Sequence, residues 1–126
     1  MKVAIVASHG VWVDHLESFL PEQITANLAG GGAEMDACVQ RYARREGLAF
    51  AACFPDYWRD GTNALRVRNQ QLAARSDMLL AFWDGCSRNT RYTIEDYLCM
   101  GHAVCIYLMQ GNTLLGQWKT SDYGTK

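Results

Sequence analysis

The segment Met78–Thr90 reads MLLAFWDGCSRNT, an apolar run that passes directly into a polar, glycine-containing turn. The run Met78–Trp83 has the length of a strand and is interrupted by Asp84-Gly85. A strand with apolar residues at every position is covered on both faces, which is typical of the inner strands of a parallel sheet. The segment therefore predicts a buried parallel strand that ends in a polar loop before a helix.

The rest of the chain alternates between similar apolar runs and helical patterns. Four further strands are predicted at Val3–Ala7, Ile24–Ala29, Leu48–Phe54 and Ala103–Met109. Apolar residues at helical spacing predict helices at Ala33–Glu46, Ala64–Arg75 and Thr90–Met100. This alternation predicts an α/β fold with an open, doubly wound, mainly parallel five-stranded sheet and helices on both faces.

The composition is that of one folded domain without a large excess of charge. The 126 residues are 49% hydrophobic and 20% charged, and the formal net charge at pH 7 is -1. A near-neutral chain disfavours non-specific binding to nucleic acid or to an anionic membrane. The apolar runs are too short to cross a bilayer as helices, and Val3–Ala7 is too short for a signal peptide. We expect residues 1–110 to form the domain and residues 111–126 to form a tail that packs on it or on an oligomer partner.

The cysteines show no spacing that is typical of a disulfide or metal site. The five positions are Cys38, Cys53, Cys86, Cys99 and Cys105, and none of them form a C-x-x-C pair. An odd number of cysteines without paired spacing disfavours a disulfide framework and a zinc site. We therefore expect buried, reduced thiols in a cytoplasmic protein, with neither a metal nor a cofactor.

Polar residues and glycines follow three of the predicted strands. Ser8 follows the first strand, Gly30-Gly31-Gly32 follows the second, and the run from Asp84 to Thr90 follows the fourth. The carboxyl ends of parallel strands meet at one edge of the sheet, where ligands bind in open α/β folds. The last two segments each open a predicted helix, and a helix start favours phosphate or carboxylate through its free N–H groups. Two such starts on one crevice predict a site for a phosphorylated ligand.

Each of these features also has an interpretation without a ligand. The glycine triplet can be a simple strand-to-helix turn, since it matches neither the dinucleotide-binding nor the Walker fingerprint. Ser87 and Thr90 are both N-cap candidates. Asn69 shares one helical stripe with Leu65 and Leu72, so it points toward the sheet, where it either holds a neighbouring loop or touches the ligand.

Several segments of the chain, taken in order, resemble the segments of one protein family. Residues 29–36, AGGGAEMD, are similar to its S-G-G-A-x-G-x-D segment, and residues 81–90, AFWDGCSRNT, are similar to its A-F-W-D-G-x-S-x-G-T segment. Tyr42–Gly47, Phe54–Trp58 and Arg68-Asn69 are similar as well, so the resemblance covers roughly Val3 to Met109. This family is the SLOG superfamily, which includes the Lonely Guy phosphoribohydrolases, DNA-processing protein A and small YspA-like proteins.

The resemblance implies a Rossmann-like sheet with a pocket for a nucleotide or a nucleotide-derived ligand. It also implies that residues 1–110 are a SLOG-like domain that binds such a ligand. Carried over position by position, the ligand-binding residues are Ser8, Gly30, Gly31, Gly32, Asp36, Arg68, Asn69, Asp84, Gly85, Ser87, Asn89 and Thr90.

Three positions depart from the family pattern. Glu34 replaces a glycine and adds bulk and negative charge beside the expected phosphate seat. Asn89 replaces the glycine before Thr90, and asparagine tolerates positive φ better than most residues. Ser8-His9 stands where the family often has Ser-Arg, so an arginine that would bind the anion is absent at this position.

The positions of the acidic residues favour binding over catalysis. The phosphoribohydrolases that the chain resembles carry a glutamate closely after their G-T, whereas the first acid after Thr90 is Glu95. Glu95 lies about 140° around the helix from Thr90 and does not share its direction. Our first hypothesis is therefore non-catalytic binding, for sensing or sequestration, of a nucleotide derivative. The alternatives are a scaffold with an empty crevice and an N-glycosidic-bond enzyme, a nucleotide phosphoribohydrolase or one like the nucleoside deoxyribosyltransferases, that uses Asp84 or Glu95.

Apolar residues toward the end of the chain predict self-association. Tyr97, Met100, Leu114, Leu115 and Trp118 offer apolar surface that a small sheet does not bury by itself. The expected partners are thus a nucleotide-derived small molecule and further copies of the chain, but neither nucleic acid nor a membrane.

Overall fold

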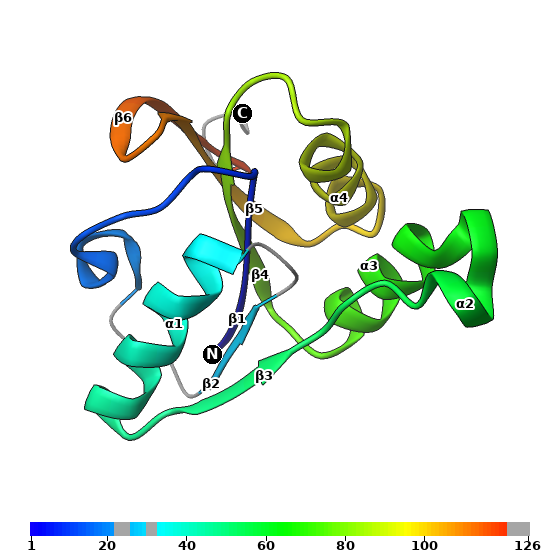
Figure 1. Cartoon of the computed structure of the whole chain (residues 1–126), viewed down its shortest axis with the longest axis horizontal. Helices are drawn as coiled ribbons and strands as arrows, with labels where there is room; N and C mark the ends of the chain where they lie inside the picture. The colour runs from blue at the N-terminus through cyan, green and yellow to red at the C-terminus, as the bar shows by residue number, and fades with distance from the viewer. Residues whose placement is uncertain (22–25, 30–32, 121–126) are drawn as a thin grey trace.

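The computed structural model describes residues 1–21, 26–29 and 33–120, and among these residues six strands form one sheet (Figure 1). The strands are β1 (Lys2–Ala7), β2 (Ala26–Ala29), β3 (Ala49–Ala52), β4 (Met78–Trp83), β5 (Ala103–Gln110) and β6 (Thr113–Lys119). The α-helices are α1 (Ala33–Glu46), α2 (Tyr57–Asp60), α3 (Ala64–Ala74) and α4 (Arg88–Cys99), and 3-10 turns cover Leu16–Phe19 and Gly61–Asn63.

The order of the strands creates a switch point in the middle of the sheet. The order is β3-β2-β1-β4-β5-β6, and every neighbouring pair is parallel except β5 and β6. The chain moves outward from β1 to β3, crosses back, and then moves outward on the other side from β4 to β6. The winding therefore reverses between β1 and β4, and at such a point a crevice opens at the carboxyl ends of the strands.

The α/β class and the mainly parallel sheet are confirmed, but the count of five strands is wrong. Thr113–Lys119, expected within the tail of residues 111–126, pairs antiparallel with β5 as a sixth strand. Gly111-Asn112 joins the two strands, and Gly111 has a φ of 59°, which favours glycine. A Gly-Asn pair between two apolar runs is a hairpin signal, so this strand could have been predicted. Residues 121–126 lie outside the described residues.

The remaining boundaries lie close to the predicted ones. α1 has the predicted bounds, whereas α4 begins at Arg88 instead of Thr90. The expected start of the second strand, at residues 24 and 25, lies outside the described residues. The polar segment after β3 is not only a loop, because Asp56 accepts the N–H of Arg59 at 3.0 Å and caps the short helix α2.

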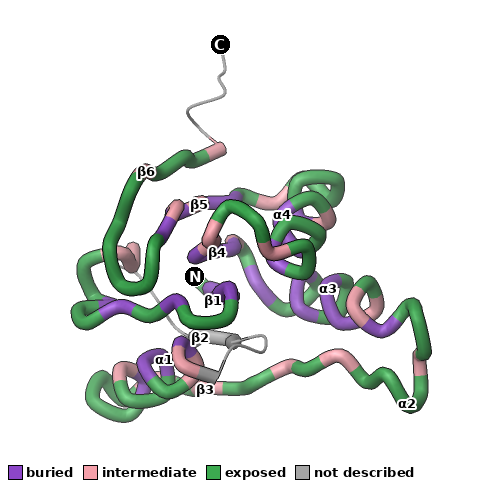
Figure 2. Tube along the Cα trace, turned by 45° about the horizontal axis from the view of Figure 1, so that its top comes forward, coloured by how far each residue is buried: buried purple, intermediate pink, exposed green. Residues whose placement is uncertain are grey.

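Each face of the sheet has its own core, because alternate residues of a strand point to opposite faces. Figure 2 shows α1 on one side of the sheet and α3 and α4 on the other. Val3 and Ile5 pack with residues of α1, whereas Ala4 and Val6 pack with residues of α3 and α4. The expectation that helices cover both faces is wrong for the outer strands. Over β5, on the side of α1, the covering ring is that of Phe19, whose centroid is 4.9 Å from that of Tyr107. Residues 11–21 therefore cover β5 on this face of the sheet, where we expected helices.

Tyr97 belongs to the core and not to an exposed surface. Its side chain is fully buried, and its hydroxyl lies 2.7 Å from Oγ of Ser76. Ser76 in turn donates to the main-chain oxygen of Leu72 at 2.8 Å, so the Tyr97 hydroxyl is the donor to Ser76. The expectation that Tyr97 offers surface to an oligomer partner is wrong, because α3 and α4 bury it against the sheet.

The thiols are all free, but only some of them are buried. Cys38 and Cys105 are buried, whereas Cys53 is half-buried and Cys86 and Cys99 are exposed. The expected burial is therefore wrong for three of the five positions. None of the described helices combines the length and the apolar character that a membrane span requires.

Candidate functional site

The side chain of Ser8 joins the two central strands. Ser8 directly follows β1, is 3% exposed, and donates its main-chain N–H to the oxygen of Phe82 in β4 at 2.9 Å. Its hydroxyl oxygen accepts the N–H of Asp84 at 3.1 Å and lies 3.1 Å from Oγ1 of Thr90 in the first turn of α4. The Ser8 hydroxyl therefore holds together the ends of β1 and β4 and the start of α4, at the switch point of the sheet.

The direction of these hydroxyl hydrogen bonds can be assigned from one to the next. Thr90 Oγ1 donates to Ser87 Oγ at 3.3 Å, so the Ser8 hydroxyl must donate to Thr90. Within the described residues the Ser87 hydroxyl proton has no acceptor, and the Ser87 side chain does not cap α4. The chain of hydroxyls thus ends on a half-buried donor at the start of the helix.

The carboxylate of Asp84 shapes the loop after β4. Its Oδ1 accepts the N–H of Cys86 at 2.9 Å and that of Ser87 at 2.7 Å. Gly85 lies between Asp84 and Cys86 with a φ of 86°, and a Cβ there would meet the Leu108 side chain at 3.3 Å. Burial raises the pKa of Asp84, but the hydrogen bonds to its carboxylate, above all those from the N–H groups of Cys86 and Ser87, outweigh this effect, so the pKa lies below the usual value of 3.8. Asp84 therefore stays ionised, and its charge holds the loop.

Arg68 and Asn69 lie in a second polar cluster, between α3 and α4. Arg68 is 5% exposed, and its Nε donates to Asn69 Oδ1 at 2.9 Å, while its other nitrogens donate to the main-chain oxygen of Cys53 at 3.3 Å and to Thr93 at 3.4 Å. Asn69 is fully buried, accepts the Thr93 hydroxyl at 3.0 Å, and donates to Asp96 at 3.0 Å. These contacts support the role in which Asn69 holds neighbouring segments together.

The second cluster extends toward the starts of α4 and α1. The Thr93 hydroxyl also lies 2.9 Å from the main-chain oxygen of Asn89, in the first turn of α4. Burial lowers the pKa of Arg68, while the charges of nearby groups, Asp36 among them, oppose this shift. Asp36 is in the first turn of α1, the helix that follows β2 in the chain. The predicted residues that gather at this end of the sheet are Ser8, Asp36, Arg68, Asn69, Asp84, Gly85, Ser87, Asn89 and Thr90.

Glu34 lies between the loop after β1 and the start of α1. Its carboxylate accepts the N–H of Gly10 at 3.0 Å and lies 3.8 Å from Nδ1 of His9. A negative charge in this position disfavours an anion beside the start of α1. Gly30, Gly31 and Gly32, the predicted phosphate loop at this helix start, lie outside the described residues. The described part of the site is therefore centred on α4.

Glu95, one of the two candidate catalytic acids, lies apart from these residues. It is exposed, and its Oε2 lies 3.6 Å from Nε of Arg91 one turn earlier.

Thr93 and Asp96 contact the second cluster, although the sequence analysis did not single them out. The signal was present, because Asn89, Thr93 and Asp96 recur at helical spacing and so share the face of α4 that meets α3.

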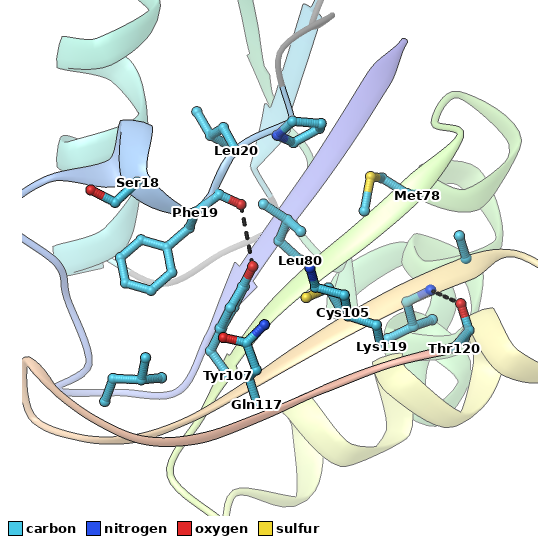
Figure 3. A pocket seen from close by; sticks show the side chains of 14 residues that line it. Ser18, Phe19, Leu20, Met78, Leu80, Cys105, Tyr107, Gln117, Lys119 and Thr120 are labelled. Carbon is cyan, nitrogen blue, oxygen red and sulfur yellow. Dashed lines mark hydrogen bonds between the residues drawn. The ribbon is translucent and has the colours of Figure 1, made fainter. Parts of the chain in front are cut away.

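A cavity of about 620 Å³ lies away from this site, on the side of the sheet that α1 covers (Figure 3). Met78 and Ala103, at the starts of β4 and β5, contribute to its mostly apolar walls, and Tyr107 donates to the main-chain oxygen of Phe19 beside it at 3.3 Å. Polar side chains line it as well, those of Ser18, Gln117, Lys119 and Thr120. In the part of the chain that the structure describes, no three His, Cys, Asp or Glu side chains are grouped so as to hold a metal ion.

Comparison of the chain with protein-family models, with curated proteins and with solved structures found no match. The resemblance to the SLOG superfamily therefore rests on the sequence segments quoted above and stays a prediction. What the site binds has to be inferred from its own geometry.

Replacing Asp84 is expected to loosen the loop after β4. Asp84→Ala leaves the N–H groups of Cys86 and Ser87 without their acceptor, and we expect the free energy of unfolding to fall by about 1 kcal/mol. The folded-state pKa is lowered, so the charge of Asp84 stabilises the protein above pH 3.8, and this stabilisation is lost as the pH falls through the lower folded value. Urea denaturation between about pH 6 and about pH 3 measures both effects. The free energies of unfolding of the wild type and Asp84→Asn should converge at the acid end. Asp14→Asn, at an exposed aspartate, should match the wild type at every pH. A difference between the wild type and Asp84→Asn that does not change with pH would contradict a stabilising charge at Asp84.

Replacing Asn69 is expected to weaken the packing of α3 on α4. Asn69→Ala removes the acceptor of a buried arginine and a partner of Asp96, so we expect the free energy of unfolding to fall by about 2–3 kcal/mol. Urea denaturation measures it, with Gln70→Ala, at the exposed neighbouring position, as the control. Equal losses in the two variants would show that Asn69 holds nothing together.

Proposed function

We propose that the chain binds a nucleotide or a nucleotide-derived ligand at the carboxyl ends of β1 and β4, for sensing or sequestration and without converting it. The observation that carries this proposal is the hydroxyl chain from Ser8 through Thr90 to Ser87. Ser8 and Thr90 are buried, so they hold the last donor in one position. A fixed donor at a helix start suits an oxygen of a phosphate or a sugar.

The first turn of α4 adds further donors to this position. The N–H of Arg91 bonds to the main-chain oxygen of Ser87 at 3.2 Å, which is the first bond along the helix. The N–H groups of residues 88–90 precede it and have no acceptor within the helix. Together with the buried guanidinium of Arg68, they make this end of the sheet favourable to an anion. The charge of Glu34 favours the anion at α4 over the start of α1.

The strand order also supports a nucleotide ligand. The order β3-β2-β1-β4-β5-β6 is that of the Rossmann fold, apart from the antiparallel direction of β6. Ligands of that fold bind at the switch point between β1 and β4, next to which Ser8 lies. We therefore propose that residues 1–110 are a Rossmann-like domain of the SLOG type and that β6 extends its sheet.

The alternative, an N-glycosidic-bond enzyme, has weaker support. A catalytic acid or base has to come within hydrogen-bond reach of the reacting group. Asp84 already holds the loop through two main-chain N–H groups, and Glu95 is exposed beside Arg91. Both carboxylates are thus already engaged, Asp84 with the N–H groups of its own loop and Glu95 with Arg91, so binding without conversion fits the contacts better.

Self-association through β6 is the second part of the proposal. β6 forms one edge of the sheet and exposes Leu114, Leu115 and Trp118. Edge strands usually avoid pairing by means of charges or proline, but the sequence of β6, TLLGQWK, has a single charge and no proline. Two identical strands can pair antiparallel about a two-fold axis, so the partner we propose is a second copy of this chain.

Thr90→Val is expected to weaken nucleotide binding. The substitution keeps the shape of the side chain but breaks the hydroxyl chain, and we expect affinity to fall about tenfold, as for a lost charge-assisted hydrogen bond. Thermal shifts with nucleoside monophosphates, cyclic dinucleotides and ADP-ribose measure it, because a ligand stabilises the state that it binds. Thr113→Val, at an exposed threonine, should keep the wild-type shifts. Absence of a shift with every compound would contradict binding, and release of free base from any of them would favour the enzyme.

Trp118→Lys is expected to prevent dimer formation. A lysine in the middle of the proposed interface adds a charge that each copy would have to desolvate. Light scattering after size exclusion should give a dimer for the wild type and a monomer for the variant. Trp58, which is 99% exposed outside β6, supplies the control Trp58→Lys. If only Trp58→Lys gives a monomer, the dimer interface involves α2 and not β6. A monomeric wild type would contradict self-association.

A further inference from the structure

A groove of about 440 Å³ lies on the outer side of α4, where it faces α2 and α3. Two phenol rings, one guanidinium, one amide and two carboxylates contribute to its walls. These groups belong to Tyr57, Arg66, Asn89, Tyr92, Glu95 and Asp96. The groove therefore combines flat aromatic surfaces with donors and acceptors in a space of limited size.

The groove adjoins the proposed nucleotide site. Asn89 belongs both to the groove and to the first turn of α4, where the chain of hydroxyls ends. With a rise of ~1.5 Å per residue, Tyr92 lies roughly 6 Å along the helix axis from Arg88. A ligand with its phosphate or sugar at the start of α4 can therefore extend a ring into the groove.

The polar residues of the groove differ in how far they are already engaged. Asp96 accepts from Asn69 at 3.0 Å and so belongs to the cluster behind the groove. Glu95 is exposed, and its single ion pair in the described structure, with Arg91, is 3.6 Å long. Arg66 is also exposed and forms no ion pair with any described residue. Arg66 and Glu95 are thus the groups that a ligand can engage with least loss of existing contacts.

We infer that the groove binds the base of the nucleotide and that this base is a guanine, an inference that rests on the proposed function. One edge of guanine presents the donors N1–H and N2–H side by side, which suits a carboxylate such as that of Glu95. Another edge presents the acceptors O6 and N7, which suit a guanidinium such as that of Arg66. The ring faces of Tyr57 and Tyr92 supply surfaces on which a base can stack.

Adenine matches these groups less well than guanine does. The edge that would meet a carboxylate carries one donor, the 6-amino group, beside the acceptor N1. The acceptor would lie against the negative charge of Glu95, and the second edge of adenine presents a donor to Arg66 where guanine presents O6. The groove therefore predicts a preference between two purines that stack equally well.

Titration calorimetry with GMP, AMP and ribose 5-phosphate tests the inference. The wild type should bind GMP about tenfold or more tightly than AMP, as for one good bidentate contact. Glu95→Gln should lower GMP affinity about tenfold and remove the preference, while ribose 5-phosphate binds as before. Tyr92→Ala should lower the affinity for both nucleotides about tenfold, and Tyr92→Phe, which keeps the ring, should not.

A matched control separates the groove from general effects of charge. Glu46→Gln removes another exposed glutamate that pairs with an arginine, Arg45 at 3.4 Å, and it should leave all three affinities unchanged. The inference is wrong if Glu95→Gln leaves GMP affinity unchanged, if the wild type prefers AMP, or if both groove variants also weaken ribose 5-phosphate binding. Each of these results leaves the proposed function standing, whereas a wild type that binds none of the three compounds overturns both.

Discussion

Ser8 is buried between two strands, and a hydroxyl in that position has to form hydrogen bonds inside the protein. It meets this requirement with the N–H of Asp84 and the hydroxyl of Thr90, which belong to the end of β4 and the start of α4. The position of α4 relative to β1 is thereby set by directional polar contacts and not only by apolar packing. The donors in the first turn of α4 are consequently held in a defined orientation at the switch point of the sheet.

A second constraint comes from the buried arginine between α3 and α4. Burying a cation is costly, and the cost is tolerated only where its donors are satisfied. Asn69, Thr93 and the main-chain oxygen of Cys53 accept from Arg68, so one guanidinium links α3, α4 and the end of β3. An apolar residue of similar size would avoid this cost, but it would leave the end of the sheet without a fixed positive charge. A role in binding an anion gives a physical reason for the arginine.

The two sides of α4 thus have different chemistry. The inner side carries hydroxyls and N–H groups that have no acceptor within the helix, and it suits a phosphate or sugar. The outer side carries rings, Arg66 and Glu95 and suits a base. The cavity beside β5 lies away from both, on the side of the sheet that α1 covers. A nucleotide with its phosphate at the start of α4 and its base in the outer groove would contact both polar regions. The proposed function and the preference for guanine together require this placement.

The pattern of apolar residues predicted all five parallel strands within a few residues. The rule that ligands bind beyond strand ends singled out Ser8, Asp84 and Thr90, which the structure places together. Local signals suffice for these features, because a strand or a helix start depends on residues close in sequence. The sixth strand was missed although Gly111-Asn112 marks its hairpin, and Tyr97 was misjudged because the sequence does not show what packs over a helix face. The roles of Asn69 as a clamp, of Glu34 as the partner of Gly10 and of Glu95 in the outer groove were decided by the tertiary structure alone. The physical reason is that such contacts join residues far apart in the chain, 82 positions for Ser8 and Thr90, so they depend on how whole elements are placed against one another.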